Sequence, residues 1–168
     1  MQQPDADTRY SRIILLGRGG AGKTRLARRL GKVLASPVLV LDEIWESDVP
    51  EFRERIVLAH AGNKWISDGN FAVASFDLRL PRATLIIWVD APKLLCSWRA
   101  LIRVLKGDET HRAKGLIKVW KFIWQFDRVN RPRIETHRLL HGPAVRVVEL
   151  KSGRDVEAFL ATLYPSGQ

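Results

Sequence analysis

One stretch constrains this chain more than any other: residues 17–24, which read Gly-Arg-Gly-Gly-Ala-Gly-Lys-Thr. It matches the phosphate-binding loop G-x-x-x-x-G-K-[ST] at every fixed position. The apolar run 13–16 before it indicates a buried strand. Residues 24–34 after it are rich in Leu, Ala, Arg and Lys and contain no proline, so they indicate a helix. The strand, loop and helix that such a loop requires are therefore all predicted.

The residue types of this loop suit a nucleoside triphosphate. Glycine lets the backbone turn left-handed and approach a ligand, so that successive N–H groups converge on phosphate oxygens at the positive end of the following helix. Lys23 is expected to reach the outer phosphates, and the Thr24 hydroxyl to ligate Mg²⁺. The residues predicted to bind the phosphates are Gly17, Gly19, Gly20, Ala21, Gly22, Lys23 and Thr24.

The composition indicates one globular domain. The 168 residues are 46% hydrophobic, enough for a single core, and one cysteine (Cys96, expected to be a buried thiol) excludes an intrachain disulfide. No signal-peptide pattern opens the chain, and no apolar run approaches a membrane span. We expect a cytoplasmic domain over 1–168, without membrane contact, in which 1–10 is a disordered or loosely attached arm.

The net charge of +10 leaves two explanations open. A basic protein suits nucleic acid or another anionic surface, whereas a phosphate-handling enzyme needs arginines around its cleft. The basic residues are scattered and form no tail, and their excess is densest between Arg99 and Arg138.

Strand-like and helix-like segments alternate along the chain. Further strands are expected at 38–41, 64–67, 84–89 and 145–150, and further helices at 50–60, 91–105, 116–126, 134–140 and 155–163. Residues 71–79 are expected to be irregular or a short helix, and about 106–114 a small lid-like loop. This order behind a P-loop predicts a three-layer α/β fold with a five-stranded parallel sheet.

Two carboxylates follow predicted strands, Asp42 after 38–41 and Asp68 after 64–67. In open parallel sheets the ligand crevice lies beyond the carboxyl ends of the strands. Asp68 is expected to hold Mg²⁺ together with Thr24, and Asp42 to orient or deprotonate an acceptor hydroxyl. Each carboxylate also has a second interpretation. Asp42 could be a solvated carboxylate at a strand end, and Asp68 could belong to a plain Asp-Gly-Asn turn.

Two further sets of side chains could serve either a binding function or a purely structural role. Arg128, Arg131 and Arg133 form either a phosphate-binding cluster or a solvated basic stretch. In the helix 116–126, Trp120 and Trp124 lie on one side, next to lysines. Such a helix suits a membrane surface or nucleic acid, but its apolar arc, roughly 220° wide at about 100° per residue, favours packing in the core.

Several motifs together carry a resemblance to a known family. They are the P-loop, Leu-Asp-Glu-Ile-Trp at 41–45, Trp-Ile-Ser-Asp-Gly-Asn-Phe at 65–71, and the segments 77–83 and 122–134. Over nearly all of 13–160 the chain resembles the adenylate-kinase-like P-loop proteins often labelled "DNA topology modulation protein". The resemblance implies a nucleoside-monophosphate-kinase-like sheet with strand order 2-3-1-4-5.

The same resemblance implies roles for basic residues and loops. Arg99 and Arg103 look like the arginines at the start of a lid, and Arg128 and Arg131 like those at its return. Residues Lys151, Ser152 and Gly153 resemble a loop whose backbone contacts adenine.

The resemblance departs from the kinase motif Asp-Gly-Phe-Pro-Arg, because Asn70, Phe71 and Ala72 follow Asp68-Gly69. The arginine that binds the acceptor phosphate is thus missing from its usual place. We expect Arg79 or Arg82 to substitute for it.

We predict an ATP-binding, Mg²⁺-dependent phosphotransferase with an unidentified small-molecule acceptor, nucleotides included. Its candidate catalytic residues are Lys23, Asp42, Asp68, Arg99, Arg103 and Arg128. A nucleotide-gated nucleic-acid-binding protein is a less favoured alternative, motivated by the charge. A slow ATPase without an acceptor is another.

Overall fold

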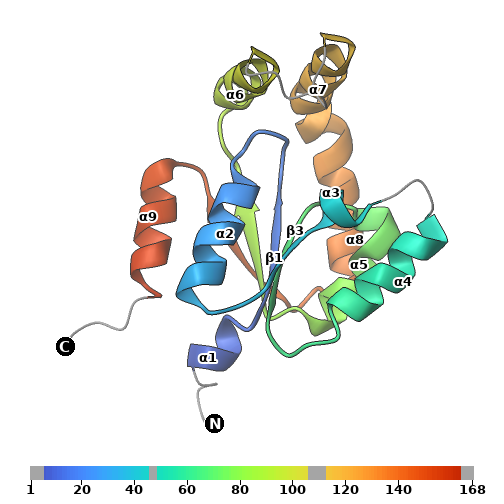
Figure 1. Cartoon of the computed structure of the whole chain (residues 1–168), viewed down its shortest axis with the longest axis vertical. Coiled ribbons are helices and arrows are strands. Elements are labelled where there is room, and N and C mark those ends of the chain that lie inside the picture. The colour runs from blue at the N-terminus through green and yellow to red at the C-terminus, as the bar shows by residue number, and fades with distance from the viewer. Residues whose placement is uncertain (1–5, 46–48, 106–112, 164–168) are drawn as a thin grey trace.

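Five parallel strands form one sheet in the order β2-β3-β1-β4-β5, as predicted (Figure 1). The computed structural model describes residues 6–45, 49–105 and 113–163. The strands are β1 Arg12–Gly17, β2 Val38–Val40, β3 Trp65–Asp68, β4 Leu85–Val89 and β5 Arg146–Leu150. Strand β1 is central, and its last residue is the first glycine of the P-loop. The sheet therefore fixes where the loop begins.

Helices cover both faces of the sheet. Helices α2 and α9 lie on one face, and α4, α5 and α8 on the other, whereas α6 and α7 lie beyond one end of the sheet (Figure 1). The helical bounds are α1 Ala6–Arg9, α2 Lys23–Val33, α3 Leu41–Ile44, α4 Val49–Ala59, α5 Ala72–Arg79, a 3₁₀ turn η1 Leu80–Arg82, α6 Lys93–Leu105, α7 Ala113–Gln125, a π-helical segment η3 Phe126–Asn130, α8 Arg131–His141 and α9 Gly153–Ala161.

The alternation of side chains along β1 builds the two halves of the core. Ile13 and Leu15 pack with residues of α2 and α9, whereas Ile14 and Leu16 pack with residues of α5 and α8. Both faces of a central parallel strand are covered by helices, so its residues are apolar without interruption. Continuous hydrophobicity here is the signature of a buried strand, as the sequence indicated.

Local structure differs from expectation in two segments. The expected arm 1–10 contains one helical turn, α1, and Tyr10 packs edge-on against Phe159. Residues 127–133 are helical throughout, because η3 continues directly into α8. Residues 72–79 form a short helix, one of the two possibilities expected there. Residues 1–5 and 106–112, the latter most of the expected lid-like loop, lie outside the described residues.

The expected core packing of the tryptophans on α7 is wrong. Trp120 and Trp124 are 43% and 51% exposed, and of the apolar residues in the described part of α7 only Ile123 is fully buried. The reason is tertiary, because α6 and α7 pair with each other beyond the end of the sheet, and no other described helix covers their outer side (Figure 1). Within the described residues no helix is long and apolar enough to cross a membrane.

Candidate active site

At Gly17 and Gly20 the P-loop takes a shape that only glycine allows. Gly17 has a φ of 139° and Gly20 a φ of 77°, both in the region that side chains disfavour. A Cβ on Gly17 would lie 2.2 Å from the Val89 carbonyl oxygen, and one on Gly20 would lie 2.8 Å from the Cys96 carbonyl oxygen. The backbone of the loop is therefore packed tightly against β4 at Gly17 and against α6 at Gly20.

Lys23 and Thr24, at the first turn of α2, turn toward the loop and the neighbouring strand. The Lys23 ammonium donates to the carbonyls of Gly17 and Arg18, each at 3.0 Å. The Thr24 hydroxyl donates to Asp68 Oδ2 at 2.5 Å. Asp68 lies there because β1 and β3 pair in parallel, with Leu15 opposite Asp68. The two residues predicted to hold a metal are thus in direct contact.

The Asp68 carboxylate has the surroundings of a cation ligand. Its side chain is buried, with 4% of the residue exposed, and its Oδ1 has no hydrogen-bond partner among the described residues. Burial raises the pKa of this carboxyl, against the hydrogen bond from Thr24 and the charge of Lys23. A buried carboxylate oxygen without a partner, beside a threonine hydroxyl, offers the hard oxygen ligands that Mg²⁺ prefers.

A cavity of about 620 Å³ lies on the α2–α9 side of the P-loop. Three predicted groups line it together: the loop segment 20–22, Arg99 of α6 and residues 151–153 after β5. Ser152 also caps α9, accepting from the N–H of Asp155 in a capping box, so the shape of this loop is fixed by the helix behind it. The cavity therefore borders the P-loop at one end and the loop 151–153 at another.

A second cavity, about 450 Å³, opens toward the α5–α8 side of the same loop. It is lined by Gly19, Lys23, Asp42, Trp45, residues 69–74, Phe122, Asn130, Arg133 and Ile134. Asp42 belongs to the short helix α3, not to a plain loop, and is exposed. The P-loop therefore separates two cavities, with Lys23 at the edge of the second.

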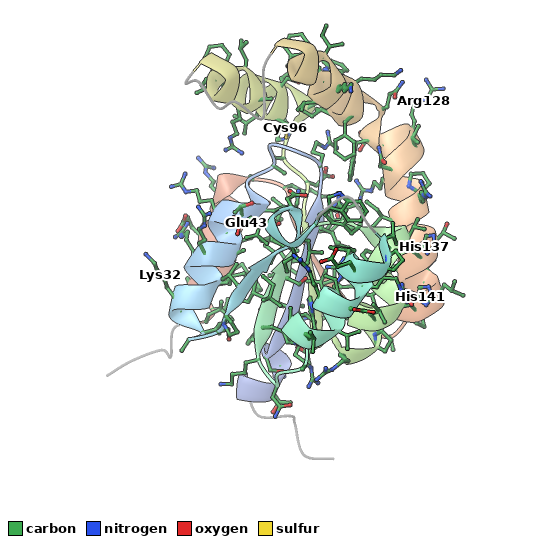
Figure 2. The ribbon with its side chains drawn as sticks, turned by 45° about the vertical axis from the view of Figure 1, so that its right-hand side comes forward. Lys32, Glu43, Cys96, Arg128, His137 and His141 are labelled. Carbon is green, nitrogen blue, oxygen red and sulfur yellow. The ribbon has the colours of Figure 1, made fainter. Side chains whose placement is uncertain are left out.

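The predicted arginines divide into two groups. Arg99 contacts the P-loop, donating to the carbonyls of Gly20 and Ala21, each at 3.2 Å. The backbone of Arg103 belongs to α6, but its side chain lies outside the described part of the structure. Arg128 is exposed and points outward at the junction of α7 and α8, away from the loop (Figure 2). The structure does not bring Arg128 to the other candidates.

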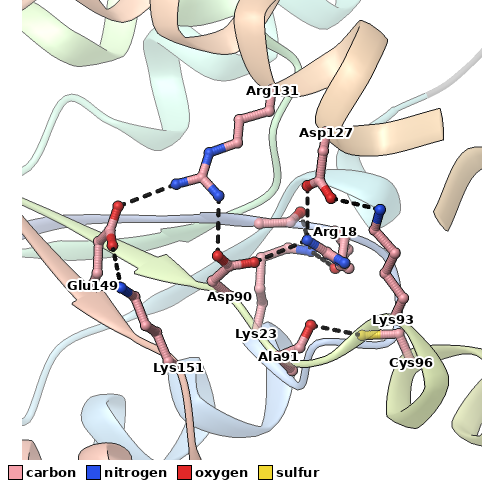
Figure 3. A network of polar contacts seen from close by, with 11 residues as sticks. Arg18, Lys23, Asp90, Ala91, Lys93, Cys96, Asp127, Arg131, Glu149 and Lys151 are labelled. Carbon is pink, nitrogen blue, oxygen red and sulfur yellow. Dashed lines mark hydrogen bonds and ion pairs between the residues drawn. The ribbon is translucent and has the colours of Figure 1, made fainter. Parts of the chain in front are cut away.

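Arg131 is bound within the protein instead of lining either cavity. Its guanidinium donates to Asp90 at 3.0 Å and to Glu149 at 3.2 Å (Figure 3). It also lies 5.0 Å from the ring centre of Trp88. In this arrangement it supports the end of β4.

The expectation that Arg79 or Arg82 binds the acceptor is wrong. Arg79 is fully buried and donates to the carbonyls of Gly69 and Asn70, at 3.2 Å and 2.7 Å. Burial lowers the pKa of Arg79 to about 9. Arg82 donates to the carbonyls of Ala61 and Gly62, at the edge of the sheet where β3 begins. The arginine that does line the second cavity is Arg133.

Sequence reasoning missed Arg18, which occupies a variable position of the motif. Its guanidinium is buried and donates to Asp90 at 2.9 Å and to Asp127 of η3 at 2.7 Å (Figure 3). Lys93 also contacts Asp127, at 2.9 Å. Although burial opposes ionisation, these two cations hold the pKa of Asp127 below its usual value. No pattern in the sequence places residues 18 and 127 side by side.

No protein-family model and no curated protein matches the sequence significantly. Solved structures do match the fold. Shikimate kinase from Acinetobacter baumannii, in complex with shikimate, superposes with a TM-score of 0.60 at 19% identity, covering 94% of this chain and 93% of that one. Shikimate kinase from Bacteroides thetaiotaomicron also gives 0.60 at 19% identity, covering 91% and 96%.

A third similar structure is the YorR protein of Bacillus subtilis in complex with phosphorylated GDP. Its TM-score is 0.58 at 16% identity, over 91% of this chain and 95% of that chain. At such identities the likeness establishes the fold alone. The chain has the α/β P-loop fold of the nucleoside-monophosphate-kinase type.

Proposed function

We propose that this protein is an ATP-dependent, Mg²⁺-requiring phosphotransferase with a small-molecule acceptor. One observation carries the proposal: the P-loop lies between two cavities, and a threonine–aspartate pair suited to Mg²⁺ lies beside it. A transferase needs a donor site and an acceptor site that meet at the phosphates. The similarity of the fold to kinases supports the same conclusion.

The donor nucleotide would occupy the larger cavity. Its base would lie near 151–153, and its phosphates would accept hydrogen bonds from the loop amides and from Lys23. Arg99, already against the loop, is in place to neutralise charge on the transferring group. Thr24 and Asp68 would hold Mg²⁺, which supplies charge neutralisation at the outer phosphates when bound.

The acceptor would occupy the smaller cavity. Asp42 lines it together with Lys23, and its carboxylate would orient an acceptor hydroxyl and take up its proton. Arg133 offers a planar, bidentate donor to an anionic group of the acceptor. The proposed roles of Arg103 and Arg128 in transfer stay predictions.

The decisive experiment is an ATP-consumption screen over nucleosides, nucleotides, sugars and other hydroxylated metabolites. We expect one acceptor class to give ADP and phosphorylated product in equal amounts, only with Mg²⁺. Lys23→Ala should lower turnover by at least about a hundredfold, whereas Lys32→Ala, an exposed lysine at the far end of α2, should not.

Two companion variants separate the donor from the acceptor site. Asp42→Asn should reduce acceptor-dependent turnover and leave nucleotide affinity unchanged, whereas Asp68→Asn should raise the Mg²⁺ concentration needed for half-maximal turnover. ADP formation that no acceptor accelerates would instead identify a slow ATPase. Absence of nucleotide binding in calorimetry, with ATP, GTP and their diphosphates, would contradict the proposal altogether.

A further inference from the structure

The pair of helices α6 and α7 carries a group of large apolar side chains on its outer surface. We call this group the outer face; it consists of Leu94 and Trp98 on α6 and of Ile117, Trp120 and Trp124 on α7. Their exposed fractions are 73%, 59%, 72%, 43% and 51%. Exposed apolar residues are common singly, but five on two paired helices, three of them tryptophans, mark an interaction surface.

The helical spacing makes this one continuous face. Residues 94 and 98 are one turn apart, and 117, 120 and 124 follow the same rule on α7. The indole N–H of Trp120 donates to the Ser97 carbonyl at 3.4 Å, which joins the two helices edge to edge. Other sides of the two helices carry Cys96 and Ile123, which are buried in the core. The outer face therefore lies apart from the side of the pair that packs in the core.

The charge of the helix pair is of one sign. The segments 93–105 and 113–125 contain no Asp or Glu, and they carry the basic residues Lys93, Arg99, Arg103, Lys114, Lys118 and Lys121. Lys118 and Lys121 are exposed, and Lys121 shares a helix face with Ile117 and Trp124. A surface of this kind is complementary to a partner that is anionic at its surface and apolar beneath.

We infer that the outer face docks on an anionic phospholipid surface. Tryptophan prefers the level of the lipid headgroups, and interfacial helices combine Trp and aliphatic residues with flanking lysines. Leu94 and Ile117 are the most exposed members of the face, and burying them in hydrocarbon would be favourable in free energy. The phosphates and base edges of a nucleic acid provide no apolar environment for such side chains. The aliphatic component therefore favours a lipid surface over a nucleic acid.

Docking in this way would leave the nucleotide cavity open. The side of α6 that lines that cavity, with Leu95, Arg99 and Ile102, adjoins the outer face without including Leu94 or Trp98. The outer face would lie against the headgroups while the P-loop stays accessible from the side. The inference does not depend on the proposed phosphotransfer.

The test is binding of the full chain to vesicles of phosphatidylcholine, with and without phosphatidylglycerol, measured by co-sedimentation and by tryptophan emission. Trp65 and Trp88 are buried and contribute a constant signal, so a blue shift reports on the exposed indoles. We expect binding and a blue shift with the anionic vesicles only, lost when NaCl is raised from about 50 mM to about 500 mM.

Variants locate the surface. Each lysine near an anionic membrane contributes about fivefold to binding, so Lys118→Gln with Lys121→Gln should weaken it about thirtyfold. Trp98→Ala with Trp124→Ala should weaken it by at least about tenfold. The matched controls, Lys32→Gln on α2 and Leu140→Ser on α8 (68% exposed), should bind as the parent does.

Three results would overturn the inference. One is failure to bind anionic vesicles at low salt while the circular dichroism shows a folded protein. Another is salt-sensitive binding of single-stranded DNA or RNA that the same tryptophan variants abolish, with vesicles giving no signal. The third is a dimer in sedimentation analysis that Trp98→Ala with Trp124→Ala converts to monomer, because a second copy would then cover the face.

Discussion

The side-chain amide of Asn70 binds both backbone polar groups of Gly17. Its Oδ1 accepts from the Gly17 N–H at 3.1 Å, and its Nδ2 donates to the Gly17 carbonyl at 2.9 Å. Asn70 follows β3, and Gly17 is the first residue of the P-loop. One side chain thus holds the start of the phosphate-binding loop to the segment that carries Asp68.

Asn70→Ala should loosen the loop, since it leaves the buried N–H and carbonyl of Gly17 without this partner. We expect a loss of about 1–3 kcal/mol in unfolding free energy, measured by urea denaturation, and weaker ATP binding in calorimetry. Asn70→Asp keeps the acceptor but sets a carboxylate against a carbonyl, so its nucleotide affinity should fall further. Parental values for both variants would show that the loop holds its shape without Asn70.

The contact between Arg18 and Asp127 should couple the P-loop to η3 energetically. In a double-mutant cycle with Arg18→Met and Asp127→Asn, we expect a coupling energy of about 1–3 kcal/mol, because Arg18 is buried and the hydrogen bond is ionic. The more exposed pair Arg53–Asp77, 2.6 Å apart, provides the control and should couple by less than about 1 kcal/mol. Equal coupling energies in the two cycles would contradict the expectation that burial of Arg18 strengthens its contact with Asp127.

Arg79 and Arg82 allow a comparison between a buried and a more accessible arginine that both bind carbonyls. Arg79→Met should cost about 2–4 kcal/mol in unfolding free energy, because it leaves the carbonyls of Gly69 and Asn70 without their donor. Arg82→Met should cost less than about 1 kcal/mol, since water can replace its contacts. Chemical denaturation of the two variants side by side measures the difference, and similar losses would contradict this ranking.

His60 should make the protein less stable in mild acid. Its Nδ1 lies 2.8 Å from the Ile56 carbonyl and its Nε2 2.9 Å from the Ser67 hydroxyl, so the neutral ring donates through Nδ1 and accepts at Nε2. Burial lowers the pKa of His60 to about 4, although the bond to Ile56 opposes it, and the charges of Arg79 and Arg82 add to the lowering.

Between about pH 6.5 and pH 4, His60 is therefore protonated in the unfolded chain but neutral in the folded chain. The free energy of unfolding consequently falls as the pH falls through that window. The loss should reach about 3 kcal/mol near pH 4. His60→Asn, measured by urea denaturation across this range, should show a shallower decline than the parent. If the unfolding free energy of parent and variant declined equally with pH, a group other than His60 would be responsible for the decline.

Much of the fold follows from local patterns. The continuous apolar runs are strands because both faces of this parallel sheet are covered, and the P-loop pattern fixes the loop and the start of α2. The contact between Thr24 and Asp68 could also be anticipated, since parallel strands end at the same edge of the sheet. The extent of the helices at 72–79 and 126–141 could not, because short apolar and basic runs do not specify whether a helix continues.

The strands, their alternation with helices and the phosphate-binding loop could be predicted from local sequence, because they depend on residue types at fixed spacing. Which polar groups meet depends on the packing of the whole chain. Arg79 is a buried support instead of an acceptor contact, Arg18 binds Asp127 from 109 positions away, and the α7 tryptophans face outward. Such outcomes depend on where whole helices pack against the sheet, and no local pattern encodes that placement.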